Sequence, residues 1–140
     1  MIGGERMAGL VEGLASVAAR DREEACETVT DWLRSFSASE VSLLTVLLAS
    51  RIVVERDRDC RESEFHALCE LLDSGLVDPA DLSALSQFDS SSLWSDEREY
   101  YEYLTGYAAD AGGTYRGGEP RVRLPGGDGG CVGGQAPGTE

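Results

Sequence analysis

The chain has 140 residues, room for one domain and a tail, and its 26 acidic residues against 12 basic ones give a net charge of −14. A negative field of this strength repels nucleic-acid backbones and anionic lipid, so we expect neither a nucleic-acid nor a membrane partner. It favours either fast encounter with a basic protein or, more simply, solubility.

No segment of the sequence indicates a membrane span or an export signal. The most apolar run, Val41 to Ala49, is soon followed by Arg51 and falls short of the roughly 20 residues that cross a bilayer. The N-terminus carries Glu5 and Glu12 and lacks the cationic region of a signal peptide. The four cysteines are too scattered for a secreted disulfide framework, so we expect a cytoplasmic protein.

The first helix is predicted to begin near Met7, which places residues 1–6 upstream of it. Its apolar residues recur at intervals of three and four, as in an amphipathic helix: Met7, Leu10, Val11, Leu14 and Val17. Gly9 and Gly13 weaken this helix by roughly 1 kcal/mol each relative to alanine, so we expect it to depend on docking.

A second helix is predicted over about residues 22–35, with Asp21 and Glu24 as its cap pair. Acidic residues in its first turn suit the positive end of the helix dipole. One face of this helix is apolar and is expected to be buried: Cys26, Val29, Trp32, Leu33 and Phe36.

The third helix, from Ala38 to about Arg56, is opened by the cap pair Ser37 and Glu40. Its valines, leucines and isoleucine point in nearly every direction around a helical wheel. A helix that is apolar on all sides belongs inside a protein, so the pattern predicts a central helix surrounded by its neighbours.

The fourth helix is predicted to begin at the cap pair Asp59 and Glu62 and to bury Phe65, Leu68, Cys69 and Leu72. Gly75 is expected to end it in the left-handed conformation, with Leu76 packing back on the last turn.

Two shorter helices follow. One runs from Pro79 to Gln87 and is expected to bury Leu82 and Leu85, and the other is capped by Ser95 and runs from Asp96 to Leu104. From Gly106 onward 12 of the 35 residues are glycine, which predicts a disordered tail over 106–140 after an acidic helical domain over 1–105.

Two helix starts share one pattern about 40 residues apart, at Phe36 to Val41 and at Val77 to Leu82. The helices before them also correspond, with Cys26, Val29, Trp32 and Leu33 set against Phe65, Leu68, Leu71 and Leu72. This pattern resembles HEAT-like or armadillo-like helical repeats over about residues 21–88. The resemblance implies an all-α stack of helical hairpins used for binding, and the alternative is an irregular bundle of about six helices.

Candidate metal ligands are Cys60, His66 and Cys69, with Cys26 or an acid as a fourth. The alternative is that Cys69 and Cys26 are buried thiols on apolar stripes and that His66 faces solvent. No nucleophile motif or phosphate-binding loop is present, and Glu64 and Glu70 are interpreted as a solvated helix face. We therefore expect no enzyme activity and no cofactor.

Protein binding without catalysis is the function that the sequence favours, and its most concrete form is an acidic immunity-type inhibitor that caps a basic toxin. Candidate contacts lie on the second and last helices: Glu23, Glu27, Asp31, Trp94, Glu97, Tyr101 and Glu102. The alternatives are a structural adaptor that binds through an apolar groove, and a small metal or redox protein that uses Cys60, His66 and Cys69.

Overall fold

Five α-helices and three 3-10 helices make up the regular structure of residues 1–112, which the computed structural model describes. They are α1 (Gly4–Leu14), α2 (Ala19–Asp31), η1 (Leu33–Ser35), α3 (Ala38–Val54), α4 (Arg58–Asp73), η2 (Pro79–Gln87), η3 (Ser90–Ser92) and α5 (Ser95–Gly112). The expected all-α fold is confirmed for this part of the chain. None of these helices is long and apolar enough to cross a membrane.

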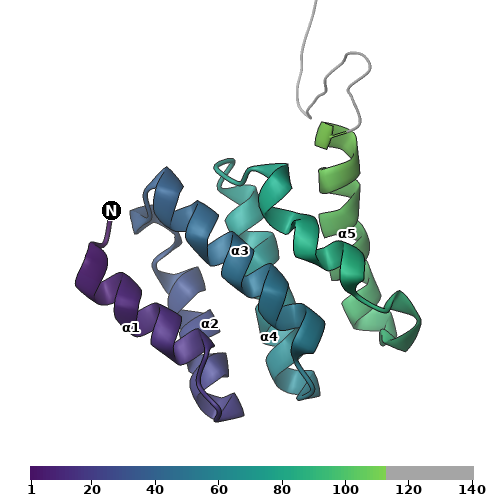
Figure 1. Ribbon diagram of the computed structural model, residues 1–140, viewed down its shortest axis with the longest axis horizontal. Coiled ribbons are helices and arrows are strands. Elements are labelled where there is room, and N and C mark those ends of the chain that lie inside the picture. The colour runs from purple at the N-terminus through teal and green to yellow at the C-terminus, as the bar shows by residue number, and fades with distance from the viewer. Residues whose placement is uncertain (113–140) are drawn as a thin grey trace, which may run out of the picture. The chain divides into compact units, whose positions relative to one another are not determined.

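Successive helices within Met1–Ala108 alternate between two layers (Figure 1). One layer contains α1, α3 and η2, with α3 packed against both neighbours. The other contains α2 and α4 side by side, and α5 contacts α4 through the stacked rings of Phe65 and Tyr100. The two segments that correspond in sequence, α2 with α4 and α3 with η2, therefore lie next to each other, whereas the family resemblance stays a prediction.

The capping box that opens α3 is present as expected. Ser37 accepts a hydrogen bond from the Glu40 amide, and the Glu40 carboxylate accepts one from the Ser37 amide. Glu40 also accepts from the amides of Ile2 and Gly3, at 3.1 Å each. The hydrogen bond from the Ser37 amide, followed by those from Ile2 and Gly3, lowers the pKa of Glu40 by more than burial raises it. Residues before Met7 thus belong to the fold, and α1 begins at Gly4.

Two other helix starts, those of α2 and α4, differ from the sequence expectation, whereas Asp78 caps η2 as expected. Among residues 1–109 no side chain caps α2, and Asp21 instead accepts a hydrogen bond from Ser16. The N-cap of α4 is Asp57, which accepts from the Cys60 amide, so the helix starts two residues earlier than a cap at Asp59 would place it. Before η2, Asp78 accepts from the Ala80 amide.

Asp81 does not complete a capping box with Asp78. Its carboxylate accepts a hydrogen bond from the Ser42 hydroxyl at 2.6 Å and so ties η2 to α3. The segment from Pro79 to Gln87 has the predicted bounds and buries Leu82 and Leu85, but it forms a 3-10 helix.

The central helix α3 is buried on only part of its circumference. Leu44, Leu48 and Ile52 are fully buried, whereas exposed fractions of 50%, 45% and 58% remain on Leu43, Val46 and Val54. The expectation of a surrounded helix is therefore wrong for this face, because α1, α4 and η2 pack against the other sides of α3.

Gly13 is the point of close approach between α1 and α2. A Cβ atom at Gly13 would lie 3.0 Å from the Ala25 Cβ, whereas one at Gly9 would meet nothing within 4 Å. Glycine at position 13 therefore lets α1 approach α2 closely, although glycine lowers the stability of the helix itself. Val17, expected on the buried stripe, is exposed because α1 ends at Leu14.

Two further features differ from the sequence prediction: the residue that packs inward after α4, and the last residue of α5. Gly75 has the expected positive φ of 79°, but Leu76 is exposed and Val77 is the residue that packs inward. The last helix extends to Gly112, so the boundary predicted at residue 105 falls inside α5. The rest of the predicted tail, residues 113–140, lies outside the described residues.

Candidate functional site

A pocket of about 270 Å³ lies where α2, α4 and α5 meet. Its lining comes from all three helices: Cys26, Glu27 and Thr30 of α2, Glu62, Ser63 and His66 of α4, and Tyr100 of α5. Within α2 and within α4 the lining residues lie about one turn apart, so helical periodicity brings them to one face. The pocket thus follows from two amphipathic helices whose polar flanks meet.

The pocket combines acidic groups with an aromatic wall. Glu27 is exposed and Glu62 is half-buried, and neither forms an ion pair among residues 1–109. The Tyr100 ring stacks on Phe65 and meets the edge of His66, with ring centroids 6.2 Å apart in each case. Burial and nearby acids, Glu62 among them, raise the pKa of Tyr100, so its hydroxyl stays protonated and neutral.

A wider groove of about 690 Å³ lies between α1 and α2. Its acidic lining residues, Glu12, Asp21 and Glu24, are joined by Arg6, whose guanidinium carbon lies 5.9 Å from the centroid of the Trp32 ring. Because it carries both signs of charge, this groove selects less strongly for a cation than the pocket at Glu27 does.

The three predicted contacts on α2 are all partly or fully accessible. Glu27 and Asp31 are exposed and Glu23 is half-buried. Only Glu27 lines the pocket, so the structure brings Glu27 together with Glu62 and Tyr100, two residues that the sequence did not single out as its partners.

The four predicted contacts near α5 divide into surface and interior. Trp94 and Glu102 are exposed, and Tyr101 is half-buried against Phe88, with ring centroids 5.7 Å apart. Glu97 is fully buried, and Arg61 donates to its two carboxylate oxygens at 2.8 and 3.1 Å. The expectation that Glu97 contacts a partner is corrected, because this carboxylate joins α5 to α4 inside the fold.

Trp94 is also engaged within the chain. The Arg58 guanidinium carbon lies 4.1 Å from the centroid of the Trp94 ring, and the Arg58 guanidinium pairs with Asp96 at 3.5 Å. Cation–π contact of this kind is worth about 0.5–1 kcal/mol at an exposed site. Arg58 therefore already covers part of the exposed Trp94 ring, which leaves less of the ring available to a partner.

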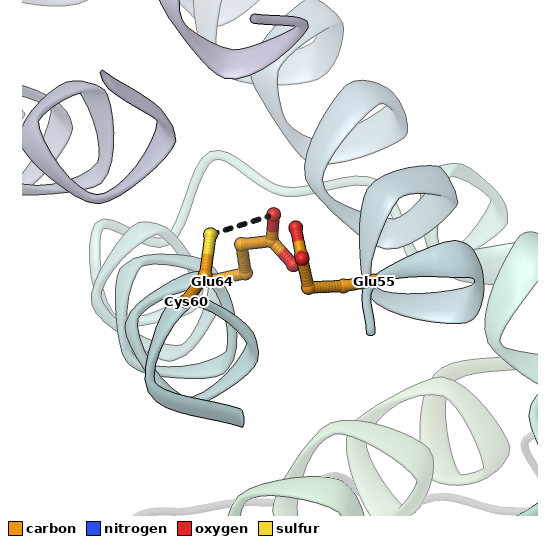
Figure 2. Close-up of side chains that lie close together, drawn as sticks. All are labelled: Glu55, Cys60 and Glu64. Carbon is orange, nitrogen blue, oxygen red and sulfur yellow. Dashed lines mark hydrogen bonds between the residues drawn. The ribbon is translucent and has the colours of Figure 1, made fainter. Parts of the chain in front are cut away.

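A second cluster of titratable groups lies inside the fold, at the turn between α3 and α4. Arg22 of α2 donates from Nε and Nη2 to the two carboxylate oxygens of Glu55, at 2.7 Å each. The Glu64 carboxyl lies between Glu55 and the Cys60 thiol, which donates to it at 3.7 Å (Figure 2). Glu64 and Cys60 are fully buried and Glu55 is 5% exposed.

The two glutamates of this cluster have pKa values shifted in opposite directions. Burial raises the pKa of Glu55, but the hydrogen bonds from Arg22 and the Asp57 amide, together with the neighbouring Glu64 and Cys60, outweigh burial and lower it to about 2. Burial, followed by the adjacent Glu55, raises the pKa of Glu64 to about 8. Burial also raises the pKa of Cys60 to about 12, so its thiol stays neutral.

The donor set of this cluster does not fit a metal ion. Glu55, Cys60 and Glu64 offer ligand atoms within 4.8 Å of one another. However, four donors from Arg22, Arg51 and the Asp57 amide already surround the Glu55 oxygens, about as many as a carboxylate accepts. Two guanidinium groups beside the site also repel a cation.

The predicted metal set of Cys60, His66 and Cys69 is not assembled. Among residues 1–109 the only group of three or more candidate ligand atoms within 4.8 Å is the one at Glu55, and it contains neither His66 nor Cys69. His66 is exposed at the pocket, and Cys69 is buried, with a pKa that burial raises to about 12. Cys60 and Cys69 are nine residues apart and so lie on opposite sides of a helix with 3.6 residues per turn.

Sequence reasoning missed the buried roles of Arg22, Glu55 and Glu64, and it assigned Glu64 to a solvated face. A signal for two of them exists in the helical period. Arg22 lies one turn before Cys26 on the apolar stripe of α2, and Glu64 lies one turn after Cys60 and one before Leu68 on α4. A charged residue that continues the helical period of a buried apolar stripe is expected to pair with another buried polar group.

Comparison of this chain with known protein families, curated proteins and solved structures gives no match.

Proposed function

We propose that this protein is a non-catalytic binding module that captures a basic partner protein on the layer formed by α2, α4 and α5. The observation that supports this most is the uneven distribution of charge. Up to residue 109, those three helices carry 12 acidic residues and 4 arginines that are not buried, whereas α1, α3 and η2 carry 3 and 2. A surface field of one sign speeds encounter with an oppositely charged surface and fixes its orientation.

The pocket between these helices supplies a contact point for the partner. Glu27 and Glu62 are carboxylates without an intramolecular ion pair in residues 1–109, and the Tyr100 ring lies beside them. A lysine or arginine side chain in this pocket would pair with carboxylate and contact an aromatic face at the same time. Inhibition of a basic toxin, in the manner of an immunity-type protein, is the biological role that we propose for such capture.

Binding of a fluorescently labelled peptide of alternating arginine and serine tests the proposal. We expect affinity that falls as salt is added, because exposed charges are screened beyond a Debye length of about 10 Å at 0.1 M salt. A variant with Glu27→Gln and Glu62→Gln should bind about tenfold more weakly. A matched control, Glu5→Gln with Glu12→Gln, removes the same charge from exposed positions of α1 and should bind nearly as the native protein does.

Two results would contradict the proposal. One is binding that does not respond to salt. The other is an equal loss of affinity in both double variants, because net charge and not the layer of α2, α4 and α5 would then determine binding.

A second candidate function is an adaptor that binds one subunit of a larger assembly through an apolar surface. The exposed side chains of Leu43, Val46 and Val54 on α3 favour it. Salt distinguishes the two candidates, since apolar contact does not weaken as ionic strength rises.

A further inference from the structure

The buried carboxyl groups of Glu55 and Glu64 differ greatly in the hydrogen bonds that they accept. Glu55 accepts from Arg22 twice and from the Asp57 amide at 3.1 Å, so its negative charge is well compensated. Glu64 accepts only from the weak Cys60 thiol donor, and its Oε1 has no hydrogen-bond partner within residues 1–109. An ionised carboxylate with so little support is costly in a buried site.

The two carboxyl groups are also too close for both to ionise. Each offers an oxygen within 4.8 Å of the other, and Glu64 is fully buried. Two negative charges at this distance in a medium of low dielectric repel strongly, and a single proton between them removes the repulsion. Figure 2 shows the Glu64 carboxyl facing that of Glu55.

We infer that Glu64 holds a structural proton at neutral pH, and that this proton joins α4 to the turn after α3 by allowing Glu64 to lie against Glu55. The proton acts here as a bound ligand of the fold. It is independent of the proposed partner binding, because the cluster is interior and the pocket at Glu27 is at the surface.

Within residues 1–109, the charged or titratable groups near Glu64, besides Glu55, come from α2, α3 and α4. From α2, Arg22 is committed to Glu55, and burial raises the pKa of Cys26, so its thiol is neutral. From α3, Arg51 reaches Glu55 at 3.5 Å, and its Nε is buried without a hydrogen-bond partner within residues 1–109. The charge of Arg51 lowers the pKa of Glu64, but burial and Glu55 raise it by more. From α4, Cys60 is neutral as well.

The sign of the resulting pH dependence follows from linkage. The pKa of Glu64 rises from its ordinary value of 4.5 to about 8 in the fold, so folded protein binds more protons than unfolded protein between these two values. The contribution of this proton to stability is fully present below pH 4.5 and is lost as pH rises through about 8. The unfolding equilibrium constant should therefore increase about tenfold per pH unit across this range from Glu64 alone.

Urea unfolding of the native protein and of Glu64→Gln, measured across this pH range, tests the inference. Glutamine has the shape and neutrality of a protonated glutamate, so the variant should fold and should lose the tenfold dependence. Glu70→Gln, at a half-buried site on the same helix, is the matched control and should keep the native dependence. Parallel pH curves for native protein and Glu64→Gln would overturn the inference.

Infrared spectroscopy of the native protein provides a second test that does not need the variant to fold. We expect the carbonyl band of a protonated carboxylic acid at neutral pH, and its disappearance above pH 8, where Glu64 loses its proton. If that band is absent at neutral pH, Glu64 is ionised and the inference fails.

Discussion

Arg22 and Glu55 are 33 residues apart in the sequence, yet the guanidinium of one donates to both carboxylate oxygens of the other at 2.7 Å. Arg22 also donates to the Ser16 carbonyl at 2.8 Å, so it connects the α1–α2 loop, α2 and the α3–α4 turn. The side chains of Arg22 and Glu55 are 10% and 1% exposed. Loss of one partner from such a pair leaves a buried charge without compensation.

Arg22→Met should therefore destabilise the protein by about 3 kcal/mol, as measured by urea or thermal unfolding at neutral pH. The matched control is Arg20→Met on the same helix, which breaks the Arg20–Glu24 pair, where the side chains are 87% and 62% exposed. An exposed pair of this kind contributes little, so we expect a change below about 0.5 kcal/mol. Equal losses of unfolding free energy in the two variants would show that the buried Arg22–Glu55 pair contributes no more to stability than an exposed pair does.

Acid should weaken the contribution of the same pair. The pKa of Glu55 falls from 4.5 to about 2 in the fold, so its stabilising contribution is present above pH 4.5 and is lost as pH falls through 2. The slope for one such group is at most about 1.4 kcal/mol per pH unit.

Comparison with the double variant Arg22→Met and Glu55→Gln isolates this effect, because it removes both charges while keeping similar volume. The free energy of unfolding of native protein minus that of the double variant should decrease as pH is lowered from 4.5 to 2. A difference that stays constant over this range would contradict the assigned pKa of Glu55.

Two glycines in α1 should respond differently to alanine. Gly9→Ala should stabilise the protein by about 0.5–1 kcal/mol, because a Cβ there meets nothing within 4 Å and alanine favours the helix. Gly13→Ala should be about 1 kcal/mol less stable than Gly9→Ala, because its Cβ would press on Ala25 at 3.0 Å. Thermal unfolding of the two variants side by side checks this, and equal stability would contradict the close approach of α1 and α2.

The candidate pocket was only partly predictable from the sequence. Glu27 was identified because its helix had an evident polar face, and it does line the pocket. The sequence places Glu62 in a helix-cap pair, and it does not single out Tyr100 as a contact residue. Glu62 and Tyr100 lie beside Glu27 because of the way α2, α4 and α5 pack. The periodicity of a single helix carries no information about that packing.

The sequence by itself determined the all-α fold, the capping box of Ser37 and Glu40, the bounds of η2 and the left-handed turn at Gly75. These features depend on residues within about four positions of one another, where backbone geometry and side-chain chemistry act locally. Only the tertiary structure decided that Glu97 and Glu55 are interior and that one face of α3 is exposed. The burial of an acid depends on a partner such as Arg61 or Arg22, brought to it from 33 to 36 residues away by helix packing.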